Sequence, residues 1–261
     1  MESALTTWER FLKDVESATK NIDEPFFRGH ADSKWPLVPS LSRYKLHAWF
    51  ENNLYYDFLT YGASWLPPST DSWDTLFIMR HHGLPTRLLD WTQSFSTALF
   101  FALRNSTTDA AIWILDAYEL NKRTIDNEAI LHPQTDLDHG YYDYFISDPR
   151  KKFRPKALAI LPNKTTPRVL AQRGVFTIHK HRDEPLDDVC KRALTKVTLP
   201  TAAFGDARVF LKRAGTNEFT LFPDLDGLAR WLSQAHDVDF AKRRSLRRGK
   251  RVRKTRASDG N

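Results

Sequence analysis

The polar and charged groups best placed to do chemistry lie in residues 79–92, which read MRHHGLPTRLLDWT. Two histidines, a threonine, an arginine and an aspartate stand here among apolar residues. They cannot all be buried unpaired, because an unpaired charge in a dry core is costly. They must therefore pair with each other or face a ligand. The candidates are His81, His82, Thr86, Arg87, Asp90 and Thr92.

Arginine suits the recognition of phosphate and carboxylate groups, because its planar guanidinium binds them in a bidentate manner. Arg28 lies near the end of a predicted strand and precedes Gly29, a residue that lets a ligand approach the backbone. Arg28 and Arg87, from separate segments, could clamp a diphosphate. The alternative is an ion pair between Arg87 and Asp90, although strand spacing would put these side chains on opposite faces.

Other chemistries lack the residues they require. The sequence has no GxxxxGK[ST], GxGxxG, HExxH or GxSxG motif. His81 and His82 are adjacent, so on a helix they would point about 100° apart and would not share a ligand. The single cysteine, Cys190, has no flanking signature. We therefore expect no metal site, no P-loop or Rossmann nucleotide site and no serine hydrolase.

Helices and short strands are predicted to position these groups. The 79–92 stretch should leave a helix, turn at Gly83 and Pro85, run as a strand and enter a second helix near residue 96. Thr6 and Glu9 suggest a capping box for a first helix, and Ser72 is a candidate cap for a later one. The remaining predicted helices cover 44–61, 72–80, 207–213 and 225–235. The other strands cover 25–30, 110–115, 157–161 and 196–199, and residues 172–179 are predicted to form a turn followed by a strand. Residues 116–156 are predicted to be mostly loop or short helix.

This mixture of helices and short apolar strands predicts an α+β domain with a central mixed or antiparallel sheet flanked by helices. A hydrophobic content of 41%, with 17 Phe and 8 Trp, supports a substantial core. No apolar run approaches the ~20 residues that span a bilayer. The N-terminus lacks a secretion signal, and one cysteine permits no internal disulfide. We expect a cytoplasmic protein without membrane contact.

The net charge of +7 is concentrated in a C-terminal tail. Residues 241–261 contain ten Lys/Arg and one acid, Asp259, so the tail carries +9 and the remainder −2. We predict that this tail is disordered. Its basic segment, residues 242–256, would bind nucleic acid by counterion release. The alternative is a solvated terminus without a partner.

Four blocks of the sequence, taken together and in order, resemble the FRG domain family, which is named after a Phe-Arg-Gly triplet. The blocks are Phe27-Arg28-Gly29, residues 81–92 with 98–102, residues 172–176 and residues 222–229. The resemblance covers about residues 5–235, and we assign residues 1–240 to this domain. At Arg80 the sequence departs from the glutamine typical of the family. The resemblance implies a bacterial or phage protein in a defence or toxin context, with an antitoxin or partner subunit as a candidate partner.

The block order is also similar to that of ADP-ribosyltransferases of the arginine-serine-glutamate type, which implies their fold. In those enzymes an arginine on the first core strand is followed by a Ser/Thr strand with an aromatic-alanine helix, and then by a turn that carries the catalytic glutamate. By that comparison Arg28 matches the first block and residues 86–102 match the second. Gln172 falls near the third. Glutamine can hydrogen-bond a ribose hydroxyl but cannot act as a base.

This second resemblance implies ADP-ribosyl transfer from NAD to a macromolecular acceptor. Arginines would hold the diphosphate, Asp90 would stabilise positive charge at ribose C1′, and a histidine would deprotonate the acceptor. Trp91 or Phe176 would stack on the nicotinamide, unless both are ordinary core aromatics. The catalytic candidates are Arg28, His82, Asp90 and Gln172, and the NAD-binding candidates are Arg28, Gly29, His81, Thr86, Arg87, Thr92 and Phe176.

A second hypothesis is a non-catalytic module that uses the same pocket to bind a nucleotide, a phosphorylated ligand or nucleic acid. The missing glutamate favours this hypothesis. Stabilisation by NAD without nicotinamide release would distinguish it from the enzyme. Both hypotheses stay open at this level.

Overall fold

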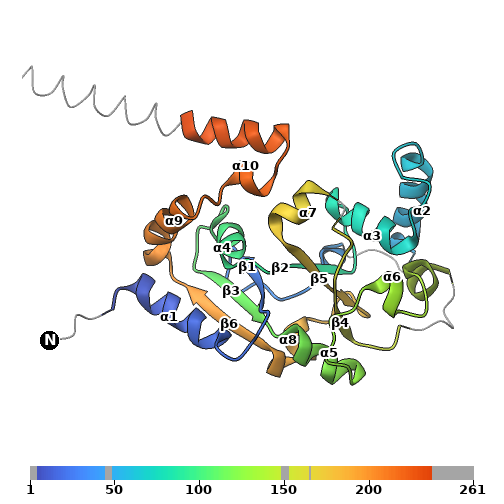
Figure 1. Ribbon diagram of the computed structural model, residues 1–261, viewed down its shortest axis with the longest axis horizontal. Coiled ribbons are helices and arrows are strands. Elements are labelled where there is room, and N and C mark those ends of the chain that lie inside the picture. Colours follow the sequence, from blue (N-terminus) through green and yellow to red (C-terminus); the bar gives the residue numbers. More distant parts are fainter. Residues whose placement is uncertain (1–4, 45–48, 148–152, 165, 237–261) are drawn as a thin grey trace, which may run out of the picture.

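A six-stranded antiparallel sheet forms the centre of the protein, with strand order β4-β5-β2-β1-β3-β6 (Figure 1). The computed structural model describes residues 5–44, 49–147, 153–164 and 166–236. This sheet confirms the predicted α+β class and its antiparallel alternative. The strands are β1 (Phe26–His30), β2 (Leu88–Thr92), β3 (Ala110–Leu115), β4 (Ala157–Ile160), β5 (Gly174–His179) and β6 (Leu194–Leu199).

Helices cover both faces of the sheet. They are α1 (Thr7–Thr19), α2 (Phe50–Gly62), α3 (Ser72–His81), α4 (Phe95–Leu103), α5 (Ala117–Ile125), α6 (Pro133–Asp136), α7 (Pro167–Gln172), α8 (Leu186–Val189), α9 (Phe204–Arg213) and α10 (Glu218–Leu221). Residues 225–236 are helical as well. One core lies between α1, α4, α9 and the β1-β3-β6 strands, and another lies beneath α5 and α8. A third core joins α2 and α3 to the strands β2, β4 and β5.

Most predicted elements are confirmed, and local capping accounts for the difference at the start of α3. Thr6 and Glu9 do form a capping box at α1. The cap of α3 is Asp71 rather than Ser72, because the Asp71 carboxylate accepts the backbone N–H of Asp74 at 2.7 Å. Within residues 116–156, which were predicted to be mostly loop or short helix, the nine-residue helix α5 starts where Asp116 caps the N–H of Glu119. The helix predicted from residue 44 begins at Phe50, and residues 45–48 lie outside the described ranges.

The sheet opens between β1 and β2. β1 pairs with β3 over all five of its residues, but its register with β2 has the single pair Phe27 and Thr92. β2, in turn, pairs with β5 along its whole length. Within the sheet, two three-stranded halves therefore meet at one residue pair and then separate. The candidate site lies at this opening.

Helix α4 packs closely on β1 at Gly29. A Cβ atom at this position would overlap the carbonyl oxygen of Ala98 and would lie 2.5 Å from the amide nitrogen of Ala102. The glycine is thus required by the packing of a helix. The role of Gly29 in the approach of a ligand stays a prediction.

We expect Gly29→Ala to lower the free energy of unfolding by about 1–3 kcal/mol, because the added methyl group meets backbone that cannot move aside. Denaturant unfolding measures this change. Gly205→Ala is the matched control, since a Cβ there meets no atom within 4 Å. The control should show no loss, and equal stability of the two variants would contradict the packing role.

Candidate functional site

Three hollows meet at the opening between β1 and β2. The arginine chamber, of about 410 Å³, is lined by four arginines and one acid, which are Arg28, Arg80, Arg104, Arg168 and Asp90. The aromatic chamber, of about 240 Å³, has walls that include Phe77, Trp91 and Phe176. A third chamber measures about 210 Å³. The side chains of Arg80 and Asp90 line all three, so this pair forms their common wall.

Asp90 is held by two arginines from two other elements. Arg80, on α3, donates from Nε to Oδ1 at 2.8 Å and from Nη2 to Oδ2. Arg28, on β1, places Nη1 3.6 Å from Oδ2 and donates to the Asp90 backbone carbonyl at 2.5 Å. That carbonyl lies beyond the last residue pair of β1 and β2. The Arg28 guanidinium therefore takes the place of a strand-to-strand hydrogen bond.

The Asp90 carboxylate stays ionised despite its surroundings. Burial raises the pKa of Asp90, but the charges and hydrogen bonds of Arg80 and then Arg28 outweigh it and lower the pKa to about 2. Burial also lowers the pKa of Arg28 to about 10, against the attraction of Asp90. The Asp90 side chain remains 39% exposed, so the carboxylate is available to a bound ligand.

The arginine chamber has an excess of positive charge. Asp90 is the only acid among its described lining residues. Arg104 also pairs with buried Glu218, at 3.1 Å, outside the chamber wall. Arg168 donates to the His81 carbonyl at 3.2 Å and lies 4.7 Å over the Phe222 ring. A chamber of this charge and size suits an anionic group with several acceptor oxygens.

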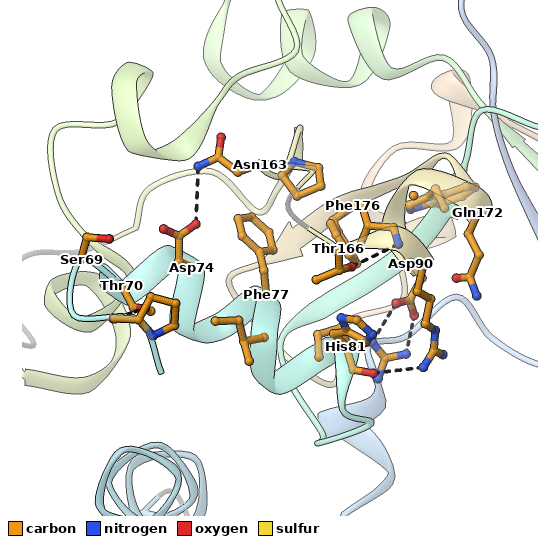
Figure 2. Close-up of a pocket in the computed structure, with 18 residues that line it drawn as sticks. Ser69, Thr70, Asp74, Phe77, His81, Asp90, Asn163, Thr166, Gln172 and Phe176 are labelled. Atoms are coloured by element: carbon orange, nitrogen blue, oxygen red, sulfur yellow. Dashed lines mark hydrogen bonds and ion pairs between the residues drawn. The ribbon is translucent and has the colours of Figure 1, made fainter. Parts of the chain in front are cut away.

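The aromatic chamber combines a flat apolar middle with polar ends. The ring of Phe176 stacks on that of Phe77 with centroids 5.5 Å apart. Figure 2 shows Asp74 and Asn163 at one end of this chamber, and Asp90 and Gln172 at the other. His81 lies near the Asp90 end, and burial lowers the pKa of His81.

The structure brings several predicted residues together. Arg28, Asp90 and Gln172 line the arginine chamber, with Gly29 and Thr92 beside them. The Thr92 hydroxyl donates to the Gln172 carbonyl at 2.6 Å, and the Gln172 amide donates to the Leu221 carbonyl at 3.0 Å. The first bond fixes β2 to the end of α7, and the second fixes α7 to α10.

Trp91 and the histidine pair are only partly at the site. The Trp91 ring is buried and donates from Nε1 to Thr177 at 3.1 Å, although Trp91 also lines both large chambers. The ring of His82 stacks on that of His81 at 5.0 Å. However, His82 is exposed and lines none of the three chambers. His81 is therefore better placed than His82 to meet a ligand.

Arg87 and Thr86 lie elsewhere, which corrects their predicted place in the site. The Arg87 guanidinium binds both carboxylate oxygens of Glu51, at 2.6 and 2.8 Å from Nε, and donates to the Lys180 carbonyl at 2.5 Å. Tyr141 donates to the same carboxylate at 2.5 Å. Thr86 is buried and accepts the Leu88 N–H. The alternative ion pair between Arg87 and Asp90 does not form, since each has other partners.

The sequence interpretation missed Arg80, Arg104 and Arg168 as site residues. The only signal for Arg80 was that it departs from the family's glutamine. Within the described ranges, no group of three or more His, Cys, Asp or Glu residues could hold a metal ion. Among the same residues, no helix is long and apolar enough to cross a membrane.

The fold and the site define an α+β protein with a cationic cleft at a break in its sheet. Residues 23–111 match the family model of the FRG domain, so the chain contains an FRG domain. The match includes Arg28, Arg80 and Asp90. The blocks at 172–176 and 222–229 lie outside it, and the predicted basic tail lies outside the described residues. Comparisons with curated proteins and with solved structures gave no match.

We expect Arg87→Met to lower the free energy of unfolding by about 3–5 kcal/mol, because it leaves the buried Glu51 carboxylate without its cation. Adding Glu51→Gln should recover part of this loss in denaturant unfolding. Lys122→Met removes one partner of an exposed ion pair and should leave stability nearly unchanged. A similarly small effect for Arg87→Met would contradict the scaffold role of Arg87.

The bond between Arg28 and His30 predicts acid sensitivity. Arg28 Nε donates to His30 Nε2 at 3.0 Å, which requires an unprotonated Nε2. Burial, followed by the charge of Arg28, lowers the pKa of His30 to about 3, whereas an unfolded histidine titrates near 6.5. The unfolded chain therefore binds more protons between these values. Stability should fall as pH drops from about 6.5 to about 3, by up to about 1.4 kcal/mol per pH unit from this residue.

Unfolding curves across this pH range test the contribution of His30. His30→Gln keeps an acceptor for Arg28 but removes the titration, so its stability should depend less steeply on pH. His82→Gln changes an exposed histidine and should follow the wild type. Parallel pH profiles for His30→Gln and the wild type would refute the assignment.

Proposed function

We propose that the cleft binds NAD and that the protein transfers ADP-ribose from NAD to a macromolecular acceptor. One observation carries the proposal: a chamber with four guanidinium groups adjoins a chamber with stacked aromatic rings. They share the residues Arg80, Asp90, Trp91, Arg168 and Gln172. A dinucleotide presents the matching pattern of a diphosphate beside planar rings. The resemblance to ADP-ribosyltransferases supports the same ligand, and we propose a defence or toxin context from the resemblance to the FRG family alone.

In this proposal the diphosphate lies against the arginines and the nicotinamide ring lies beside Phe176. The glycosidic bond between C1′ and the nicotinamide nitrogen breaks, and nicotinamide leaves with the electron pair. The ionised carboxylate of Asp90 stabilises the positive charge that develops on the ribose. The acceptor then forms a bond to C1′ and gives its proton to a base. His81 is the best placed base, since burial lowers its pKa and favours the neutral ring.

A second candidate function is ligand recognition without catalysis. Two observations favour it. Gln172 occupies the position near which the related enzymes carry glutamate, and its amide is engaged by the Leu221 carbonyl. Both oxygens of Asp90 also accept hydrogen bonds from Arg80, which reduces the carboxylate's ability to respond to the ribose.

Binding of NAD and release of nicotinamide, measured separately, test both candidates. We expect the wild type to bind NAD and release nicotinamide in the presence of its acceptor. Arg168→Gln should weaken NAD binding about 10-fold or more, because it removes a charged donor from both chambers. Asp90→Asn should retain NAD binding and lose nicotinamide release. Lys191→Gln removes an exposed cation that lines none of the three chambers and should change neither quantity.

The outcomes separate the two functions. NAD binding without nicotinamide release, tested against protein and nucleic acid acceptors, would establish the recognition module. No NAD binding by a folded wild type would overturn ADP-ribosyl transfer and the recognition of NAD, but not the recognition of another phosphorylated ligand. For the acceptor we propose nucleic acid, since residues 242–256 supply a dense run of Lys and Arg in the sequence. Labelled NAD traces where the ADP-ribose goes, and deletion of 241–261 tests the tail.

A further inference from the structure

The third chamber lies on the other side of the pair formed by Arg80 and Asp90. It is lined by the three arginines Arg28, Arg43 and Arg80, by the hydroxyl residues Ser40 and Tyr44, and by Asp90. Arg43 lines neither of the two larger chambers. The segment Ser40–Arg43 forms a short 3₁₀ turn, which brings Ser40 and Arg43 to the same hollow.

Hydrogen-bond donors outnumber acceptors in this chamber. Ser40 Oγ accepts from Arg80 Nη1 at 2.9 Å and from the Thr86 N–H at 3.2 Å. These two bonds use both lone pairs of the hydroxyl, and no described residue accepts its proton. Arg28 Nη2 likewise donates to no described residue. The only carboxylate among the described lining residues is Asp90, and its oxygens are already bonded to Arg80.

The contacts of the fold do not explain why Arg43 lies at the third chamber. Arg43 is exposed and forms no ion pair with any residue that the structure describes. Its charge acts unfavourably on that of Arg28, which is already buried. Three cations therefore converge on one carboxylate. An anion that accepts several hydrogen bonds would offset this repulsion.

We propose that the third chamber binds a phosphate group of the acceptor, with Arg43 and Ser40 as its specific ligands. The identity of the ligand as an acceptor group rests on the proposed function, but phosphate binding does not. A volume of about 210 Å³ suits a single phosphate group better than a whole nucleotide. The sugar and base attached to that phosphate would extend along the wall formed by Arg80 and Asp90. This wall also borders the chambers assigned to NAD, so the acceptor would meet the reacting ribose there.

The acceptor phosphate is assigned to nucleic acid. The sequence favours this source over a phosphorylated protein, because the ten Lys/Arg in residues 241–261 suit the binding of a polyanion. A single phosphate on a protein would gain much less from such a tail. Competition by an oligonucleotide and by a phosphopeptide separates these two sources.

Binding of inorganic phosphate to the full chain at low ionic strength, followed by calorimetry, tests the site. We expect saturable 1:1 binding that persists when NAD is saturating. Arg43→Gln should weaken phosphate binding at least 10-fold and leave NAD binding unchanged. Ser40→Ala should weaken it several-fold and serves as the second variant if Arg43→Gln fails to fold. Lys212→Gln, which removes an exposed cation from α9, should have no effect.

Arg104→Gln distinguishes the chambers, because Arg104 lines only the arginine chamber. It should weaken NAD binding and spare phosphate binding. Phosphate that competes with NAD and responds to Arg104→Gln but not to Arg43→Gln would overturn the proposal. Phosphate binding that responds to Arg43→Gln, in a protein that binds no NAD, would sustain the site and refute only the proposed function.

Competition against bound phosphate tests the source. A 5′-phosphorylated single-stranded oligonucleotide should displace inorganic phosphate from the wild type more effectively than a phosphoserine peptide. The same oligonucleotide with a 5′-hydroxyl shows how much of this displacement comes from the terminal phosphate. Displacement by the phosphopeptide alone would overturn the assignment to nucleic acid.

Discussion

The site depends on the ion pairs that Arg28 and Arg80 form with Asp90 where the sheet opens between β1 and β2. Asp90 belongs to β2, Arg80 to α3 and Arg28 to β1, so one carboxylate joins three elements. Arginine and aspartate compensate each other's desolvation, which makes the burial of charge at this opening tolerable. Two of these residues, Arg80 and Asp90, also form the wall that divides the cleft into chambers. The charge that stabilises the junction thus also sets the chemistry available to a ligand.

The strand residues of the site were predictable from the sequence, because their surroundings are local. Arg28 and Asp90 each interrupt a short apolar run, and that pattern alone identifies a charge within a sheet. Arg80 required more information. Gly83, with φ of 84°, turns the chain between α3 and β2 and returns Arg80 to the side of Asp90, ten residues later. Sequence spacing does not reveal which side chains such a turn brings together.

Arg87 is the opposite case, because the sequence predicted it as a site residue and its actual partners are distant in the chain. It has the residue type and the neighbours of a phosphate ligand, but its partners are Glu51 and the Lys180 carbonyl. These partners lie 36 and 93 positions away in the chain, on α2 and after β5. Similarly, the sequence pointed to Gly29 as a structurally important glycine. It did not show that the backbone of α4 packs against this position. Local patterns predicted the α+β class and most elements, and long-range packing decided which polar residues face the cleft.

The break in the sheet has a mechanical consequence. Each half of the sheet has its own continuous ladder, but between β1 and β2 backbone pairing is limited to one residue pair, and Arg28 supplies the next link. A ligand that accepts hydrogen bonds from Arg28 and Arg80 would therefore alter the interactions that hold the two halves of the sheet together. Through these guanidinium groups, occupancy of the cleft would change how firmly the two halves of the sheet are held together.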